Sequence, residues 1–320
     1  MLDNIIKAIR YQYPDRIPVE VSLVPAAWQR YGEKLNDIRA KYPFVFGEEG
    51  KTPYTREEID AMPDSYRTGS FTDCWGCRWE NVNEGYESIV VGHPLPERED
   101  VWKLTAPEEN DEMPHGFMFL RLFDLRGWEE MMIDFFEEPP ELTRLIDVVC
   151  DYNVRQMQLL CDHQADEVLW VGDDNGIQHS MPIHPDTWRK YIKPAYRKIF
   201  NVAHRAGKIV YFHTDGCIHE VMPDMQEVGA DIINCQYRAN GLENIKRVCK
   251  GKIPVDLDLD RQMFPFATPE QIRDHIRQCC REMYLPEGGL ILSAECAADV
   301  PLENIDMICR TLNECALYKG

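Results

Sequence analysis

Residues 208–235, KIVYFHTDGCIHEVMPDMQEVGADIINC, contain the pattern that decides the fold. The apolar run at 208–216 predicts a strand, residues 218–228 have helical spacing, and 230–235 predicts a second buried strand. A strand, a helix and another strand in this order form a βαβ unit, in which the two strands are parallel. The stretch therefore predicts a parallel α/β sheet.

The same alternation continues on both sides of this unit. Further strands are expected at 16–23, 166–174, 253–258 and 289–295, and further helices at about 140–161, 185–206, 242–249, 269–282 and 301–317. Pro139 and Pro140 open the first of these helices. The count favours a closed eight-stranded (β/α)8 barrel, or TIM barrel. A doubly wound sheet is the alternative, but the glycine-rich phosphate turn that it calls for after the first strand is missing.

Residues 65–100 interrupt this alternation with aromatic residues, glycines and alternating apolar positions. We expect an inserted hairpin and loop on the catalytic rim, where barrel insertions usually shape the substrate pocket. No repeat, low-complexity tract or linker is visible, so a single domain over residues 1–320 is expected.

Charge and composition narrow the class of function. With 35 Lys and Arg against 55 Asp and Glu, the formal charge is -20, which disfavours nucleic acid and anionic membranes as partners. The charged start and the lack of about 18 consecutive apolar residues predict neither a signal peptide nor a membrane span. Twelve scattered cysteines are expected to be reduced thiols in a cytoplasmic protein.

The active site of a parallel barrel forms where its strands end, so polar residues at those ends are the candidates. They are Asp173, Asp174, His213, Asp215, Cys235, Gln236, Asp256, Asp258, Asp260, Glu295 and Cys296. The sequence CWGC at 74–77 has metal-like spacing, but no second pair accompanies it, and two packed thiols are the favoured interpretation.

His213 and Asp215 lie two apart at a strand end, so their side chains share a face. This is the geometry that two ligands of one metal need, and Glu295 or Cys296 could supply a third. Three protein ligands and an open position form the catalytic zinc arrangement. A plain hydrogen bond between His213 and a neighbouring carboxylate is the alternative.

The run DLDLD at 256–260 places three carboxylates on one face of a strand. They must face water, a cation or a substrate, and a polar rim is preferred for Asp260. Asp173 and Asp174 could serve as general acid or base, as substrate anchors, or as partners of their own backbone.

Several stretches resemble the C-terminal half of the uroporphyrinogen decarboxylase superfamily, in the same order and with similar spacings. They are VGDDNGIQHSMPIHPDTWRKYIKPAYRKIF, HRAGKIVYFHTDG, GADIINCQ, VDLDLDRQ and PEGGLILSAECAADVPLENI. DCWGCRWEN at 73–81 resembles the insertion of methyltransferase-like members. The resemblance implies the barrel and a pocket at the carboxyl ends of its strands.

The resemblance also implies a choice between two chemistries. Decarboxylases of the superfamily hold a polycarboxylate tetrapyrrole through an arginine-rich segment after the first strand. Here that place reads PVEVSLVPAAWQRYG, with Glu20 and without paired arginines, so an acidic chain would hold such a polyanion poorly. The chain looks more like the cobamide-dependent methyltransferase branch.

Members of that branch bind zinc through a His-x-Cys pair where His213 and Asp215 stand here, and through a later cysteine near Cys296. The zinc activates the methyl acceptor or polarises the donor, and a corrinoid protein presents or accepts the methyl group. Asp215 is a harder ligand than the family's cysteine, which suits an oxygen-containing substrate. A metal-free acid/base pair of His213 and Asp215 stays open.

We therefore predict a methyltransferase that moves a methyl group between a small methylated compound and a separate corrinoid protein, since no cobalamin-binding segment is visible. Zn²⁺ would be held by His213, Asp215 and either Cys296 or Glu295. Catalysis is assigned to His213, Asp174 and Asp258, and substrate contacts to Asp173, Gln236, Trp75 and Trp79. The alternatives are a metal-independent lyase acting on a smaller carboxylic acid, and a non-catalytic subunit that docks the corrinoid protein.

Overall fold

The computed structural model describes residues 2–61 and 64–320. The chain forms two compact units. The first unit contains the described residues up to 69 together with 81–88 and 236–320, and the second contains 70–80 and 89–235. Because two compact units can belong to one domain, the expected single domain stays a prediction.

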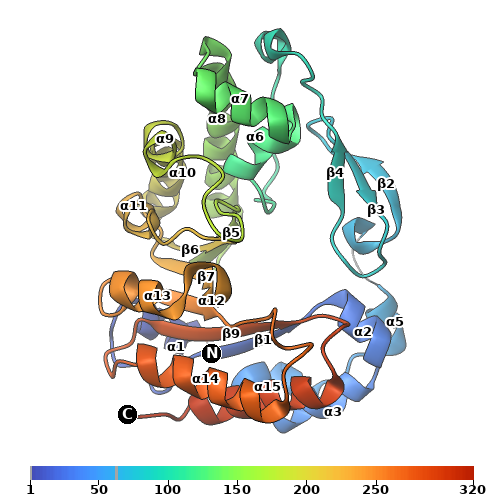
Figure 1. The fold of residues 1–320 in the computed structure, drawn as a ribbon, viewed down its shortest axis with the longest axis vertical. Coiled ribbons are helices and arrows are strands. Elements are labelled where there is room, and N and C mark those ends of the chain that lie inside the picture. The colour runs from blue at the N-terminus through green and yellow to red at the C-terminus, as the bar shows by residue number, and fades with distance from the viewer. Residues whose placement is uncertain (1, 62–63) are drawn as a thin grey trace. The chain divides into compact units, whose positions relative to one another are not determined.

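The first unit is built around three parallel strands. β9 (Leu290–Cys296) lies between β1 (Val19–Leu23) and β8 (Val255–Asp258). The helices α14 (Pro269–Met283) and α15 (Leu302–Cys315) lie side by side (Figure 1) and bury their apolar faces. The other helices of this unit are α1 (Leu2–Ile9), α2 (Pro25–Tyr31), α3 (Lys34–Lys41), α4 (Pro43–Phe46), α5 (Arg56–Asp60), α12 (Tyr237–Asn240) and α13 (Leu242–Cys249).

The second unit carries the strands that hold the candidate site. β6 (Ile209–Thr214) pairs in parallel with β5 (Val168–Gly172) on one side and with β7 (Ile232–Gln236) on the other. The long helix α8 (Pro140–His163) lies against α10 (Lys193–Arg205), as Figure 1 shows. The remaining helices are α6 (Phe119–Arg126), α7 (Trp128–Glu137), α9 (Pro185–Tyr191) and α11 (Met222–Glu227).

The parallel α/β architecture is confirmed, but a closed eight-stranded barrel is not. Six strands of the described chain take part in parallel pairings. The described residues between β1 and β5 form helices, 3-10 turns and one small separate sheet, so the second and third strands of a barrel have no counterpart there. The chain instead uses this stretch for the insertion and for α6 to α8.

The insertion expected at 65–100 contains that small sheet. Its strands β2 (Gly69–Thr72), β3 (Arg78–Asn81) and β4 (Ile89–Gly92) are ordered β2-β3-β4, with β3 and β4 antiparallel. One helix boundary also differs from expectation, because the segment 185–206 forms two helices, α9 and α10, that meet at Ile192. Pro194 has no N–H for a continuous helix, which explains the break.

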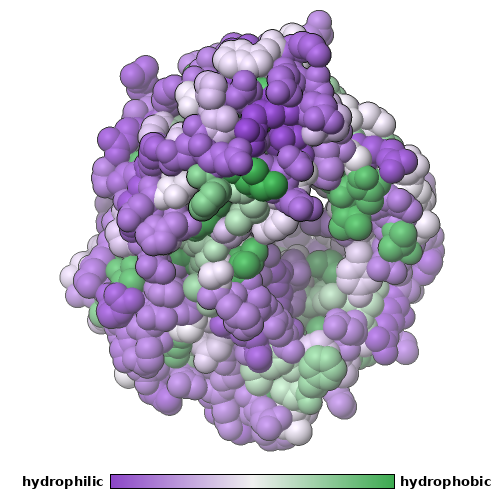
Figure 2. Space-filling view, turned by 45° about the horizontal axis from the view of Figure 1, so that its top comes forward, coloured by the Kyte–Doolittle hydropathy of each residue, from purple (hydrophilic) through white to green (hydrophobic). Residues whose placement is uncertain are grey.

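Hydrophilic residues predominate on the face of the molecule in Figure 2, and the hydrophobic residues there form separate small groups. This agrees with the formal charge of -20. Within residues 2–61 and 64–320, every helix is too short or too polar to cross a bilayer.

Candidate functional site

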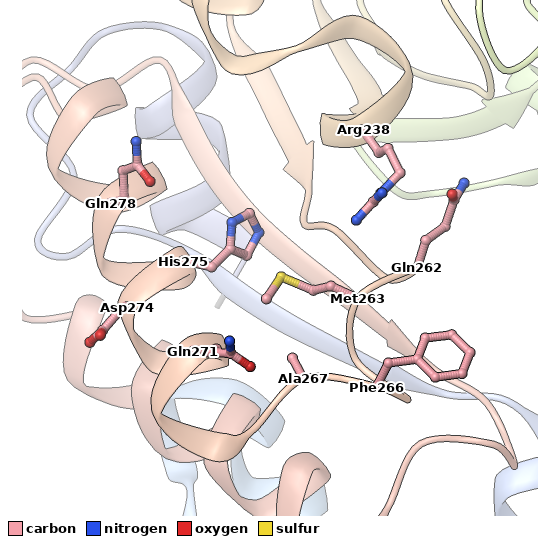
Figure 3. A pocket seen from close by; sticks show the side chains of 9 residues that line it. All are labelled: Arg238, Gln262, Met263, Phe266, Ala267, Gln271, Asp274, His275 and Gln278. Carbon is pink, nitrogen blue, oxygen red and sulfur yellow. The ribbon is translucent and has the colours of Figure 1, made fainter.

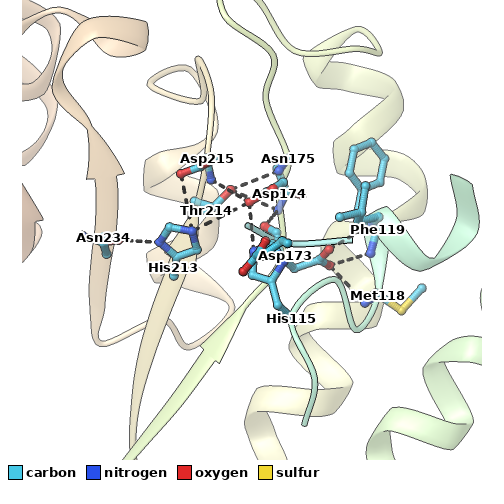
Figure 4. Close-up of polar contacts among 12 residues, drawn as sticks. His115, Met118, Phe119, Asp173, Asp174, Asn175, His213, Thr214, Asp215 and Asn234 are labelled. Atoms are coloured by element: carbon cyan, nitrogen blue, oxygen red, sulfur yellow. Dashed lines mark hydrogen bonds and ion pairs between the residues drawn. The ribbon is translucent and has the colours of Figure 1, made fainter. Parts of the chain in front are cut away.

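His213 stands near the end of β6 in a defined orientation. Its Nδ1 lies 2.5 Å from Oδ1 of Asn234, the residue paired with it on β7 (Figure 4). An amide oxygen only accepts hydrogen bonds, so Nδ1 carries the proton and donates it. The other ring nitrogen, Nε2, therefore faces the carboxylates of Asp174 and Asp215.

Two carboxylates approach that nitrogen. His213 Nε2 lies 3.4 Å from Oδ1 of Asp215 and 3.9 Å from Oδ1 of Asp174. The backbone N–H of Asp215 donates to the same Asp174 oxygen at 3.0 Å. Burial raises the pKa of Asp174, but the hydrogen bonds from His115 and from the Asp215 N–H outweigh it and hold that pKa below its ordinary value. Asp174 is therefore ionised at neutral pH.

His115, which the sequence reasoning missed, completes the group. It lies in the loop before α6, and its Nε2 is 3.2 Å from Oδ1 of Asp174. The N–H of Gly116 donates to the carbonyl of Gly172 at 2.9 Å, which ties this loop to the end of β5. A Cβ at Gly172 would lie 2.7 Å from Cδ2 of His115, so a glycine is needed there to admit the ring.

The loops that follow β5 and β6 cross so closely that their backbones are in contact. A Cβ on Gly216 would lie 2.1 Å from the carbonyl carbon of Gly176, so neither loop could make this approach with a side chain at that point. The N–H of Gly176 donates to the carbonyl of Asp215 at 3.1 Å. The crossing holds Asp174 and Asp215 next to each other, although they are far apart in the sequence.

The surroundings of Asp173 differ from those expected of a substrate-binding residue. Its carboxylate is fully buried and accepts the backbone N–H groups of Met118, Phe119 and Leu120 at 3.1, 2.5 and 2.9 Å. The hydroxyl of Tyr196 also donates to it at 2.6 Å. Burial raises the pKa of Asp173 to about 6. Since its oxygens are engaged with the start of α6, Asp173 anchors that helix beneath the site.

A buried hydrogen-bonded layer continues from Asp173. The side-chain nitrogen of Asn175 donates to the Asp173 carbonyl at 2.7 Å and to the Tyr196 hydroxyl at 2.9 Å. Its oxygen accepts the indole N–H of Trp188 at 2.7 Å, and its backbone N–H donates to Thr214 Oγ1 at 3.1 Å. Buried networks in which every polar group has a partner make their surroundings rigid. This network therefore holds the backbone next to Asp174 in place.

The residues present fit a zinc ion. His115, Asp174 and His213 each offer one donor atom, and these atoms all lie within 4.8 Å of one another. Two imidazole nitrogens and a carboxylate oxygen, with an open position, are the ligands of one class of catalytic zinc site. Within the part of the chain that the structure describes, no other group of three or more such residues meets the same criterion.

The aromatic residues of the insertion have mainly structural contacts. Trp75 is buried and meets the ring of Tyr152 on α8 edge to face at 4.9 Å, which differs from the rim position expected of it. Trp79 is partly exposed, and its indole N–H donates to Asp73 at 3.0 Å. In the CWGC motif, Cys77 is buried as expected of a packed thiol, whereas Cys74 is exposed.

Four residues to which the sequence assigned a catalytic, substrate-binding or metal-binding role belong to the first unit. Asp258 is buried, and the guanidinium of Arg261 lies 3.7 Å from it and also donates to Glu295 at 2.8 Å. Cys296 is fully buried, and burial together with nearby carboxylates raises the pKa of its thiol. The carbonyl of Gln236 accepts from Asn240 at 2.9 Å. The roles assigned to these four side chains stay predictions.

The expectation of a polar rim for Asp260 is wrong. This residue is buried, and the guanidinium of Arg238 donates to both of its oxygens, at 2.7 and 2.6 Å. The guanidinium supplies the counter-charge that lets the carboxylate leave water. Arg238 and the neighbouring His275 line a cavity of about 680 Å³ (Figure 3) that contains none of the predicted site residues.

The family model described as uroporphyrinogen decarboxylase (URO-D) matches residues 124–315, well over half of the chain. The chain therefore belongs to the uroporphyrinogen decarboxylase family. This family match covers β5 to β9 and thus all the strands from which the candidate site was predicted. No curated protein matches the sequence.

Among solved structures, the chain is similar to a methyltransferase from Methanosarcina mazei, with 14% identity, 98% of each chain covered and a TM-score of 0.66. At this identity the likeness concerns the fold. A B12-independent methionine synthase from Shewanella sp. W3-18-1 gives a TM-score of 0.36 at 12% identity, over 94% of this chain and 97% of that one.

Proposed function

We propose that this protein is a methyltransferase that moves a methyl group between a small methylated compound and a corrinoid protein. The observation that carries the proposal is the setting of His213, whose Nε2 faces Asp174 and Asp215 at the end of β6. Family membership and the fold likeness to a methyltransferase support it. The segment after β1 also lacks the paired arginines that a tetrapyrrole polyanion would need.

A zinc ion held by His213 and Asp215, with either Cys296 or Glu295 as the third ligand, would act as a Lewis acid on an oxygen of the methyl compound. In the demethylating direction, the methyl–oxygen bond would break with its electron pair left on the oxygen, and that oxygen would take up a proton. The corrinoid protein would supply the reduced nucleophile whose electron pair accepts the methyl group. Asp258 is the proposed proton carrier, with Asp174 in that role only where it does not bind the metal. Gln236 and Trp79 are the proposed substrate contacts.

A second candidate function is metal-free proton transfer, as in a lyase acting on a smaller carboxylic acid. The observation in its favour is that each of two histidines lies close to a carboxylate: His115 is 3.2 Å from Asp174, and His213 is 3.4 Å from Asp215. Such pairs can hold and pass a proton without a metal.

The test is methyl transfer to reduced cobalamin, used as a surrogate for the corrinoid protein. The purified chain, prepared with zinc, is mixed anaerobically with cob(I)alamin and with methanol, methyl ethers or methylamines, and the cobalt absorption is followed. We expect methylation with one class of donor, and a loss of about 100-fold or more in the His213→Ala variant. His204→Gln is the control, because His204 makes a similar 2.9 Å contact with Asp231 outside the site.

Other outcomes would replace the proposal. Release of CO2 from a carboxylic acid, without corrinoid or metal, would establish the lyase. Tight binding of a corrinoid protein with no turnover of any methyl donor would indicate a docking subunit.

A further inference from the structure

We infer that His115, Asp174 and His213 form a divalent transition-metal site contained within the second unit. Two of these three ligands, His115 and Asp174, were not predicted to bind metal. This metal site and the proposed function share the same location around His213. Metal binding can nevertheless be measured without methyl transfer.

The spacing of the donor atoms is close to that of ligands around one ion, because all three atoms lie within 4.8 Å of one another. With metal–nitrogen and metal–oxygen bonds of about 2.0–2.2 Å, two ligand atoms of a tetrahedral site lie about 3.3–3.6 Å apart. Asp174 Oδ1 lies 3.2 Å from Nε2 of His115 and 3.9 Å from Nε2 of His213. Small movements of the side chains would let all three donor atoms bind one cation.

The orientation of these donors is fixed by the residues around them. Oδ1 of Asn234 accepts a hydrogen bond from the Nδ1–H of His213, and metal-bound histidines almost always donate their other ring N–H in this way. The N–H of Asp215 donates to the Asp174 carboxylate, which limits its rotation. Gly172 leaves room for the His115 ring, whose centroid lies 5.5 Å from that of His213. Figure 4 shows how these side chains converge.

The chemistry of the donor set selects the class of metal. Imidazole ligands suit zinc, copper, iron and nickel, whereas magnesium and calcium prefer all-oxygen sites. Asp174 brings a negative charge, and Asp215 offers a further oxygen 3.4 Å from His213 Nε2. The site therefore fits Zn²⁺, and Co²⁺ can replace it as a spectroscopic probe.

The experiment measures metal binding by the full chain. Zinc content is determined by plasma mass spectrometry after equilibration with Zn²⁺ and removal of the excess, for the wild type and for His115→Ala, Asp174→Asn and His213→Ala. We expect about one zinc per wild-type chain and an affinity at least about 100-fold lower in each variant. His204→Gln, the matched histidine outside the site, should bind zinc like the wild type.

Cobalt substitution separates this site from one that uses the cysteine of β9. Co²⁺ bound by nitrogen and oxygen gives visible bands without the near-ultraviolet charge-transfer band of a thiolate ligand. We expect no such band, and we expect Cys296→Ala to keep its metal. A thiolate band, or zinc retained in His115→Ala and Asp174→Asn but lost in Cys296→Ala, would overturn the inference.

Circular dichroism of each variant separates a lost ligand from a lost fold, and His115→Ala is the most informative change because His115 lies in an exposed loop. The two proposals can fail separately. If these three residues bind metal but the chain transfers no methyl group, the metal site is supported and the methyltransferase function is wrong. If the chain transfers methyl groups but binds no zinc, the methyltransferase function is supported and the metal site is wrong.

Discussion

His213 on β6 donates its Nδ1 proton to the side-chain oxygen of Asn234 on β7, with the two atoms 2.5 Å apart. The two residues are also paired in register, so the strands themselves hold the donor and the acceptor together. This contact decides which ring nitrogen of His213 is available to a metal.

The first prediction concerns this hydrogen bond. Asn234→Ala removes the acceptor, frees the His213 ring to rotate and should weaken zinc binding about 10- to 100-fold. Asn234→Asp restores an acceptor and should recover most of the affinity. Competition with a chromophoric zinc chelator measures both variants, and equal affinity in Asn234→Ala and the wild type would show that the contact does not position the ligand.

The second prediction concerns the glycine beneath His115. In Gly172→Ala, the new Cβ would lie 2.7 Å from Cδ2 of His115 and 3.3 Å from Cδ2 of His213, so the His115 loop must move. We expect zinc affinity to fall roughly as far as in His115→Ala. A double-mutant cycle provides the control: adding His115→Ala to Gly172→Ala should cause little further loss. Additive losses would mean that Gly172 acts on another ligand.

The third prediction concerns the layer under the site. Tyr196→Phe removes the hydroxyl that donates to Asp173 at 2.6 Å and leaves that buried carboxylate with one donor fewer. The free energy of unfolding should fall by about 1–3 kcal/mol, while the zinc stoichiometry stays at one. Urea unfolding measures the change, with Tyr13→Phe at an exposed position as the control. An unchanged unfolding free energy would show that the layer adds nothing to stability.

Sequence patterns located the part of the site that lies on strands. His213, Asp215 and Asp174 follow buried apolar runs, and parallel strands bring their carboxyl ends together, so their proximity followed from the order of the elements. His115 could not be found in this way. It lies in an irregular loop before α6, and its position depends on the bond between Gly116 and Gly172 rather than on any periodicity.

Burial of polar residues was the harder part to predict. Asp173 and Asp174 are neighbours in the sequence, yet the first is fully buried under α6 and the second faces the histidines. The difference arises from three backbone N–H groups at the start of α6, and α6 belongs to a different part of the chain. Trp75 likewise packs on Tyr152 of α8, a partner that no local pattern indicates.

The last prediction uses the pH dependence of stability. Asp124 on α6 is buried, and burial raises its pKa to about 6 although the guanidinium of Arg121 lies 3.5 Å away. Between its ordinary pKa of 3.8 and about 6, the native state therefore holds a proton that the unfolded state has lost. The stability that depends on this proton is present below pH 3.8 and disappears as the pH rises through 6.

Asp124→Asn keeps the shape of the side chain and cannot ionise. The unfolding free energy of the wild type minus that of Asp124→Asn should therefore fall by about 2–3 kcal/mol between pH 4 and pH 7. Asp224→Asn provides a control of opposite sign. Burial raises the pKa of Asp224, but its bonds with Lys193 and Arg189 lower that pKa overall. The unfolding free energy of the wild type minus that of Asp224→Asn should therefore grow as the pH rises. Urea unfolding at several pH values measures both, and a flat difference for Asp124→Asn would mean that Asp124 does not hold this proton.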